Sequence, residues 1–169
     1  MTSGRFWPSC TPLSVSLALL ASPGCGGGGS QACIECPPIE GRYTLELGQE
    51  APPPTCSGLG EEFPAGPLEV ERTGSHVTAR LDEMTLSGTL YVTYDFNLVG
   101  IRSGAADGGT GGPESASLSG RYIPALGDGG VPRLVGTWQG SYAGTPGGES
   151  QRCLVTRSFT AIRQQAGAP

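Results

Sequence analysis

The 169-residue chain contains no lysine and a single histidine, His76. Without lysine it has neither the phosphate-binding lysine of a P-loop nor the catalytic lysine of a kinase or Schiff-base enzyme. Any serine-histidine-aspartate triad or histidine metal site must use His76, which follows Gly74 and Ser75 in a short turn sequence. No serine stands on a strand-to-helix elbow. We therefore interpret His76 as an exposed turn residue.

Basic charge is also scarce. Ten arginines oppose 15 acidic residues, which gives a net charge of −5 at pH 7. Residues 1–24 contain one arginine, Arg5, and no acid, so the rest of the chain carries −6. A nucleic acid is therefore not an expected partner, because phosphate contacts need a basic surface.

No group of carboxylates has a spacing specific to catalysis or metal binding. Glu69 and Glu71 share one face of an expected strand, about 7 Å apart, as a glycosidase pair would, but a solvated strand face explains them equally well. Asp107 and Asp128 each precede two glycines, yet neither has the ligand spacing of a calcium loop. We expect no metal, no cofactor and no enzymatic activity, and a hydrolase is the least favoured hypothesis.

The N-terminal region is typical of an export signal. Residues 13–21 form an apolar run that is too short to span a bilayer as a mature helix, and the residues before it include Arg5 and no acid. We predict a signal peptide over 1–24, a flexible glycine-rich tether over 25–38 and one β domain over 39–165.

A small residue, Gly24, stands directly before Cys25. This arrangement resembles the lipobox of bacterial lipoproteins, whose signal peptidase cuts before a cysteine that carries a lipid. The resemblance implies a palmitate-bearing lipid anchor on Cys25, and by analogy with Gram-negative sorting, Gly26 in place of aspartate favours the outer membrane. An ordinary secretory cleavage, giving a secreted or periplasmic protein, is the alternative.

Four cysteines remain beyond Cys25, an even number that implies two disulfides in an oxidising compartment. Three pairings are possible. We favour Cys56 with Cys153. Closing a loop of nearly a hundred residues lowers the conformational entropy of the unfolded chain, which stabilises the fold by about 4 to 5 kcal/mol. Cys33 then pairs with Cys36. The alternative for this Cys-x-x-Cys pair is a redox motif or a zinc knuckle, but it has neither a helix start nor a second knuckle.

From residue 39 onward, short runs of alternating apolar and polar residues are separated by glycine and proline, and no helical period extends over ten residues. Alternation of this kind predicts an all-β domain. The run from Met84 to Leu98 keeps one parity, but as a single strand it would span about 50 Å, so we divide it near 93–95. The expected strands are 42–47, 68–73, 76–81, 84–92, 95–102, 116–123, 133–142 and 153–163.

Glycine followed by a polar and then a large apolar residue recurs at Gly41, Gly88, Gly120 and Gly136. Glycines within strands mark bends or close approaches that allow a sheet to coil and close on itself. Eight sequential strands with this pattern predict a small antiparallel up-and-down barrel, with a β-sandwich as the alternative. With the cysteine motif, the chain resembles the small lipocalin-like barrel lipoproteins of Gram-negative envelopes.

Four aromatic residues have inward parity and either line a cavity or fill it: Tyr43, Phe96, Tyr122 and Trp138. We favour the filled barrel. The first functional hypothesis is then a non-enzymatic envelope lipoprotein whose barrel is a structural or protein-interaction module. A carrier of a small apolar ligand is the second, and it requires an open barrel.

Overall fold

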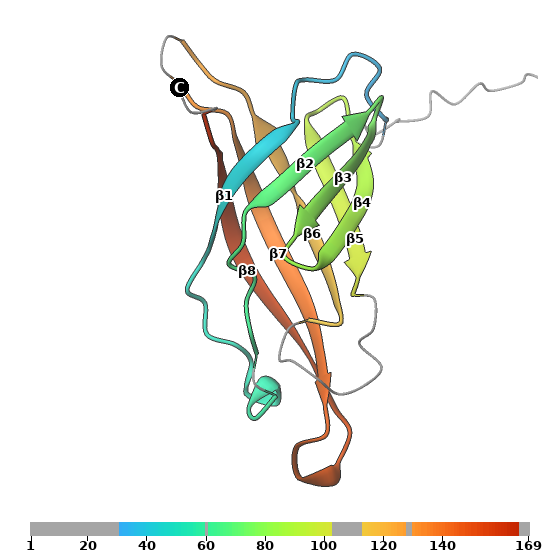
Figure 1. Cartoon of the computed structure of the whole chain (residues 1–169), viewed down its shortest axis with the longest axis vertical. Coiled ribbons are helices and arrows are strands. Elements are labelled where there is room, and N and C mark those ends of the chain that lie inside the picture. Colours follow the sequence, from blue (N-terminus) through green and yellow to red (C-terminus); the bar gives the residue numbers. More distant parts are fainter. Residues whose placement is uncertain (1–30, 60, 103–112, 128–129, 166–169) are drawn as a thin grey trace, which may run out of the picture.

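The computed structural model describes residues 31–59, 61–102, 113–127 and 130–165. Each strand pairs antiparallel with the next one in sequence, and the last strand returns to pair with the first, so the sheet closes into a barrel (Figure 1). The expected all-β up-and-down barrel is confirmed, and the sandwich alternative is wrong. The strands are β1 (Gly41–Leu47), β2 (Leu68–Thr73), β3 (His76–Leu81), β4 (Met84–Leu90), β5 (Asp95–Ile101), β6 (Ser115–Ile123), β7 (Arg133–Gly144) and β8 (Gln151–Arg163).

The connections define two ends of the barrel. We call the end formed by the β2–β3, β4–β5 and β6–β7 connections the upper end, as it stands in Figure 1. The lower end is formed by the β1–β2, β3–β4, β5–β6 and β7–β8 connections. Two short 3-10 turns, η1 (Pro54–Cys56) and η3 (Pro146–Gly148), lie in connections of the lower end.

The run from Met84 to Leu98 is divided into two strands, as its length predicted. β4 ends at Leu90, two residues earlier than expected, and β5 begins at Asp95. The amide of Tyr94 donates to the carbonyl of Tyr91 at 2.9 Å, and Tyr94 takes a left-handed φ of 66°. The alternation of inward and outward side chains stops at this turn. Val92, whose position in the alternation would place it in the core, is exposed instead.

Glycines allow the barrel to coil tightly between β6 and β7. Gly120 and Gly136 are directly opposite each other in the register. A Cβ added to Gly136 would lie 2.2 Å from the carbonyl oxygen of Ser119, and one added to Gly120 would lie 2.2 Å from that of Val135. The close approach that the glycine pattern predicted is present here, because any side chain would force the two backbones apart.

One cluster of buried apolar side chains, to which all eight strands contribute, fills the barrel. Phe96 of β5 and Phe159 of β8 face each other across it, with ring centroids 6.5 Å apart. No polar or charged residue in the described part of the chain belongs to the buried class. The strands were expected to alternate, and their inward positions do form the core.

Both expected disulfides are present. Cys56 in η1 is bonded to Cys153 in β8 and so ties the β1–β2 connection to the β7–β8 hairpin at the lower end. Cys33 is bonded to Cys36 ahead of β1. Since the sulfurs of each pair are bonded to each other, the zinc alternative has no thiolates to use. The redox alternative for Cys33 and Cys36 stays a prediction, because a disulfide is also the oxidised form of a redox motif.

Candidate functional site

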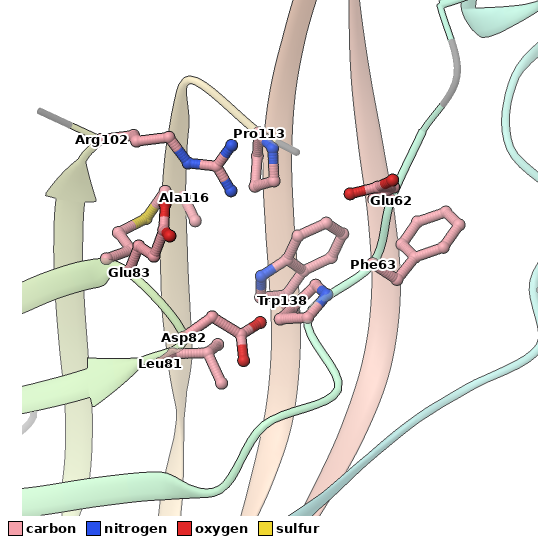
Figure 2. Close-up of a pocket in the computed structure, with 11 residues that line it drawn as sticks. Glu62, Phe63, Leu81, Asp82, Glu83, Arg102, Pro113, Ala116 and Trp138 are labelled. Atoms are coloured by element: carbon pink, nitrogen blue, oxygen red, sulfur yellow. The ribbon is translucent and has the colours of Figure 1, made fainter. Parts of the chain in front are cut away.

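A pocket of about 320 Å³ opens at the lower end of the barrel. Its walls come from segments far apart in sequence: the β3–β4 turn, the stretch Glu62–Pro64 of the β1–β2 connection, and both sides of the β5–β6 connection (Figure 2). The charged side chains are three carboxylates and one guanidinium, and two aromatic rings are among the apolar ones. The lining residues discussed below are Glu62, Phe63, Asp82, Glu83, Arg102 and Trp138.

Trp138 forms the inner wall of this pocket. The side chain is fully buried, and its indole Nε1 has no hydrogen-bond partner. Figure 2 shows this nitrogen on the side of the ring that faces Asp82 and Arg102. The ring has room because Gly140, two residues on and on the same face of β7, has no side chain: a Cβ there would lie 2.4 Å from the indole.

Phe63 lies beside Trp138, with ring centroids 5.9 Å apart in an edge-to-face arrangement. The guanidinium carbon of Arg157 is 3.6 Å from the centre of the Phe63 ring, a distance typical of a cation–π contact. The hydroxyl of Tyr142 donates to the carbonyl of Glu62 at 3.1 Å, and burial raises the pKa of Tyr142 above its usual value. These contacts hold the Glu62–Pro64 stretch against the end of the core.

The β3–β4 connection consists of two acidic residues, Asp82 and Glu83, between the paired residues Leu81 and Met84. Asp82 takes a φ of 50°, a left-handed conformation that aspartate tolerates better than most side chains do. Both acids are exposed at the rim of the pocket. Neither residue was predicted from sequence to belong to a site, although an acidic pair between two alternating runs is a visible signal for a turn.

The four inward aromatics do not come together in one cavity. Trp138 lines the pocket, whereas Tyr43, Phe96 and Tyr122 are buried in the core closer to the upper end. The hydroxyl of Tyr43 donates to the carbonyl of Ile39 at 2.6 Å, and burial is the main cause of its raised pKa.

The other residues considered from sequence lie on the outside or beyond the described residues. His76 begins β3 and is exposed at the upper end. Glu69 and Glu71 are both exposed on the outer face of β2, where the carboxylate of Glu69 is 3.7 Å from the guanidinium of Arg42. The expected signal segment, Cys25, Asp107 and Asp128 lie outside the described residues.

A group of two sulfurs and a carboxylate occurs at the lower end, where Cys56, Cys153 and Glu61 have atoms within 4.8 Å of one another. The two cysteines are joined in a disulfide. Disulfide sulfurs are not thiolates, which are the form that ligates zinc, so this group is not a candidate metal centre.

The upper end holds the start of the described chain. Ala32 forms a β-bridge with Tyr91. The amide of Cys33 donates to the carbonyl of Leu90 at 3.1 Å, and the amide of Val92 donates to the carbonyl of Gln31 at 3.0 Å. The part of the expected tether from 31 to 38 is thus fastened to the β4–β5 hairpin.

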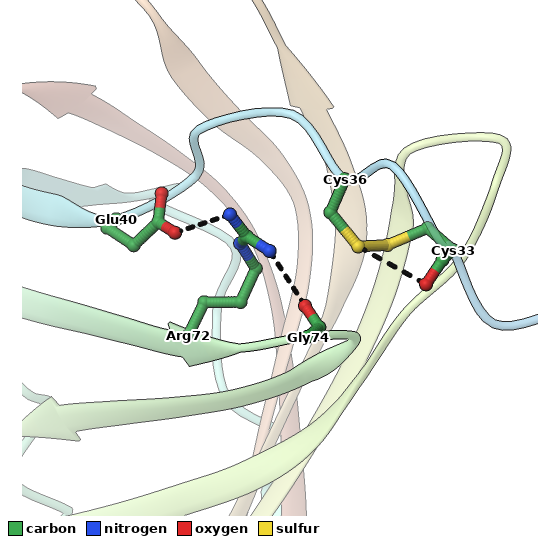
Figure 3. The surroundings of a disulfide bond; sticks show 5 residues. All are labelled: Cys33, Cys36, Glu40, Arg72 and Gly74. Carbon is green, nitrogen blue, oxygen red and sulfur yellow. Dashed lines mark hydrogen bonds and ion pairs between the residues drawn. A yellow bond between two sulfur atoms is a disulfide. The ribbon is translucent and has the colours of Figure 1, made fainter.

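Next to this attachment, Arg72 at the end of β2 joins the upper end to the chain before β1. Its guanidinium is 2.6 Å from the carboxylate of Glu40 and donates to the carbonyl of Gly74 at 2.8 Å (Figure 3). The Cys33–Cys36 disulfide lies nearby in the same segment (Figure 3).

Several large apolar side chains are exposed at this same end. Ile34 is 87% exposed and Leu126, in the β6–β7 connection, is 81% exposed. Val92 and Tyr94 in the β4–β5 turn are partly exposed. The upper end therefore has apolar loop tips, and the lower end has both the charged rim of the pocket and two exposed apolar side chains, Ile101 of β5 and Leu154 of β8.

Comparison with known proteins gives no match to a family model, a curated protein or a solved structure. Among the described residues, the structure has no helix with the length and apolar character to cross a membrane.

Proposed function

We propose that this protein is an exported, non-enzymatic module of the bacterial envelope, held at the membrane by a lipid on Cys25. In this proposal the upper end of the barrel faces the bilayer and the lower end faces away from it toward a partner. The observation that carries the proposal is the attachment of residues 31–33 to the β4–β5 hairpin, which determines the end of the barrel from which an anchor would extend.

The distance between anchor and barrel supports this orientation. Five residues, 26–30, separate the lipidated cysteine from the first attached residue, and a glycine-rich chain of that length spans about 12 Å. A tether this short keeps the upper end close to the headgroups. Exposed Ile34 and Leu126 at that end are suited to the apolar boundary of a bilayer, which favours side chains of this kind.

The two disulfides support export, because such bonds persist in oxidising compartments. The packed core supports a scaffold more than a carrier of an apolar ligand. A carrier needs an open interior, but all four aromatics that would line it belong to the buried core, although Trp138 also borders the lower-end pocket.

The anchor is tested by labelling cells with radioactive palmitate. We expect label in the wild-type protein and none in Cys25→Ser, which would also leave the membrane fraction. An unlabelled wild-type protein would refute the anchor and leave the secreted alternative.

The orientation is tested separately, on the lipidated protein in vesicles that contain nitroxide lipids. A fluorophore is attached at position 126 through Leu126→Cys, or at position 101 through Ile101→Cys as the matched control, since Ile101 is 77% exposed at the lower end. We expect strong quenching at 126 and little at 101. Equal quenching at both positions would contradict the orientation while leaving the anchor intact.

A further inference from the structure

The pocket at the lower end combines a buried donor that lacks an acceptor with a negatively charged rim. A buried N–H without a partner is unfavourable because it has lost its hydrogen bonds to water, so the Nε1 of Trp138 is a group that a bound molecule can satisfy. The donor faces into the pocket, toward Asp82 and Arg102 (Figure 2). A ligand for this site therefore carries a hydrogen-bond acceptor.

The charge of the rim determines the other half of the ligand. Carboxylates of Glu62, Asp82 and Glu83 line the pocket together with one guanidinium, that of Arg102. Three negative charges against one positive charge leave a net charge of −2, which favours a cation whatever else Arg102 contacts.

The aromatic rings favour the same kind of ligand. Trp138 and Phe63 both line the pocket, but one face of the Phe63 ring is covered by the guanidinium of Arg157, so the Trp138 ring is the aromatic surface for a ligand cation. Aromatic rings beside carboxylates are the surroundings in which proteins bind ammonium groups. A volume of about 320 Å³ admits a molecule of the size of choline and excludes a long lipid chain.

We propose that the lower-end pocket binds a small organic ammonium compound that carries a hydroxyl or carbonyl oxygen. The ammonium group lies among the carboxylates of Glu62, Asp82 and Glu83, and the oxygen accepts from the Nε1 of Trp138. This site needs neither the lipid anchor nor the membrane-facing orientation, so binding can fail while the proposed function stands, and the reverse also holds.

Trp138 itself reports binding, because the sequence has only one other tryptophan, Trp7. The full chain carrying Trp7→Phe is titrated with three probes while its fluorescence is recorded. The probes are choline, the uncharged tert-butyl analogue of choline, and tetramethylammonium, which has the charge but no acceptor. We expect a saturable change with choline, none with the uncharged analogue, and weaker binding of tetramethylammonium.

Asp82→Asn tests the role of the rim charge. Asparagine accepts the left-handed φ of Asp82, so the turn is retained while the charge is lost. We expect choline affinity to fall about tenfold. The matched control is Glu35→Gln, which removes one exposed charge at the upper end and should leave the affinity unchanged.

Trp138→Phe tests the donor, with binding measured by calorimetry because the reporter is lost. We expect this variant to bind choline and tetramethylammonium equally, since only the indole distinguishes them. The proposal is overturned if choline does not bind saturably, if the uncharged analogue binds as well as choline, or if Asp82→Asn and Glu35→Gln behave alike. Equal binding of choline and tetramethylammonium to the parent chain would overturn the assignment of the indole as the group that recognises the oxygen.

Discussion

Removing the Cys56–Cys153 disulfide should destabilise the barrel far more than removing the Cys33–Cys36 disulfide. The first bond joins residues 97 apart in sequence and the second joins residues three apart. From the loop-closure entropy of the unfolded chain, the long loop is worth about 4.7 kcal/mol at 25 °C and the short one about 1.6 kcal/mol. For a domain of this size the larger loss lowers the melting temperature by roughly 15 °C.

The assay is urea unfolding of the double variants Cys56→Ala/Cys153→Ala and Cys33→Ala/Cys36→Ala beside the parent chain under non-reducing conditions. Circular dichroism reports the barrel. The free energy of unfolding should fall in the ratio of the two loop terms, with a further small loss at Cys56, which is fully buried. Equal losses of unfolding free energy in the two variants would refute the reasoning, because loop length would then not determine how much each disulfide stabilises the fold.

Three further predictions follow from packing and charge. Gly136→Ala should destabilise the barrel by about 3 kcal/mol in urea unfolding, the upper part of the range for overpacking, because its Cβ would overlap the backbone of β6; a loss below about 1 kcal/mol would show that β6 and β7 separate easily. The hydrogen bond and charge of Arg121 lower the pKa of Asp95, so the pair stabilises the fold above the pKa of an unfolded aspartate, and stability is lost as the pH falls toward the lowered value. Asp95→Asn should therefore reduce the acid dependence of stability, and an unchanged pH profile would contradict the role of the pair. Burial raises the pKa of Tyr43, Tyr122 and Tyr142, so absorbance titration of the folded protein should show three tyrosines that ionise above the usual range, with Tyr43 and Tyr142 last. Stability should fall as the pH rises above the pKa of an unfolded tyrosine; ionisation of all tyrosines together near pH 10 would contradict their burial.

The strands were predictable because barrel strands of this kind have one face in the core. Alternation between Val77, Ala79 and Leu81 alone indicates the inward face of β3, and all three are buried. The positions at which the strands end were predicted less accurately. β7 and β8 extend two residues further at the lower end than expected, to Gly144 and from Gln151, since pairing within their hairpin continues past the last inward apolar side chain.

The pocket was not predictable in the same way. Its parts come from three connections and the inner face of β7, and their distances along the chain say nothing of their distances in space. Trp138 was identified as an inward aromatic, but only packing shows that its Nε1 lacks a partner. In the sequence, Asp82 and Glu83 look like ordinary turn residues. Only the β3–β4 register and the surrounding fold place them at the rim of the pocket.

The sequence by itself determined the fold class, the number and order of the strands, and the closure suggested by glycines within them. These features depend on the alternation of apolar and polar residues and on backbone sterics, both of which are set by residues close together in the sequence. It also narrowed the cysteines to one favoured pairing, because loop length can be counted. Tertiary structure alone decided which inward aromatics pack and which one borders a pocket, and it placed the start of the described chain and that pocket at opposite ends of the barrel. Those properties arise from contacts between distant segments, whose geometry exists only once the sheet has closed.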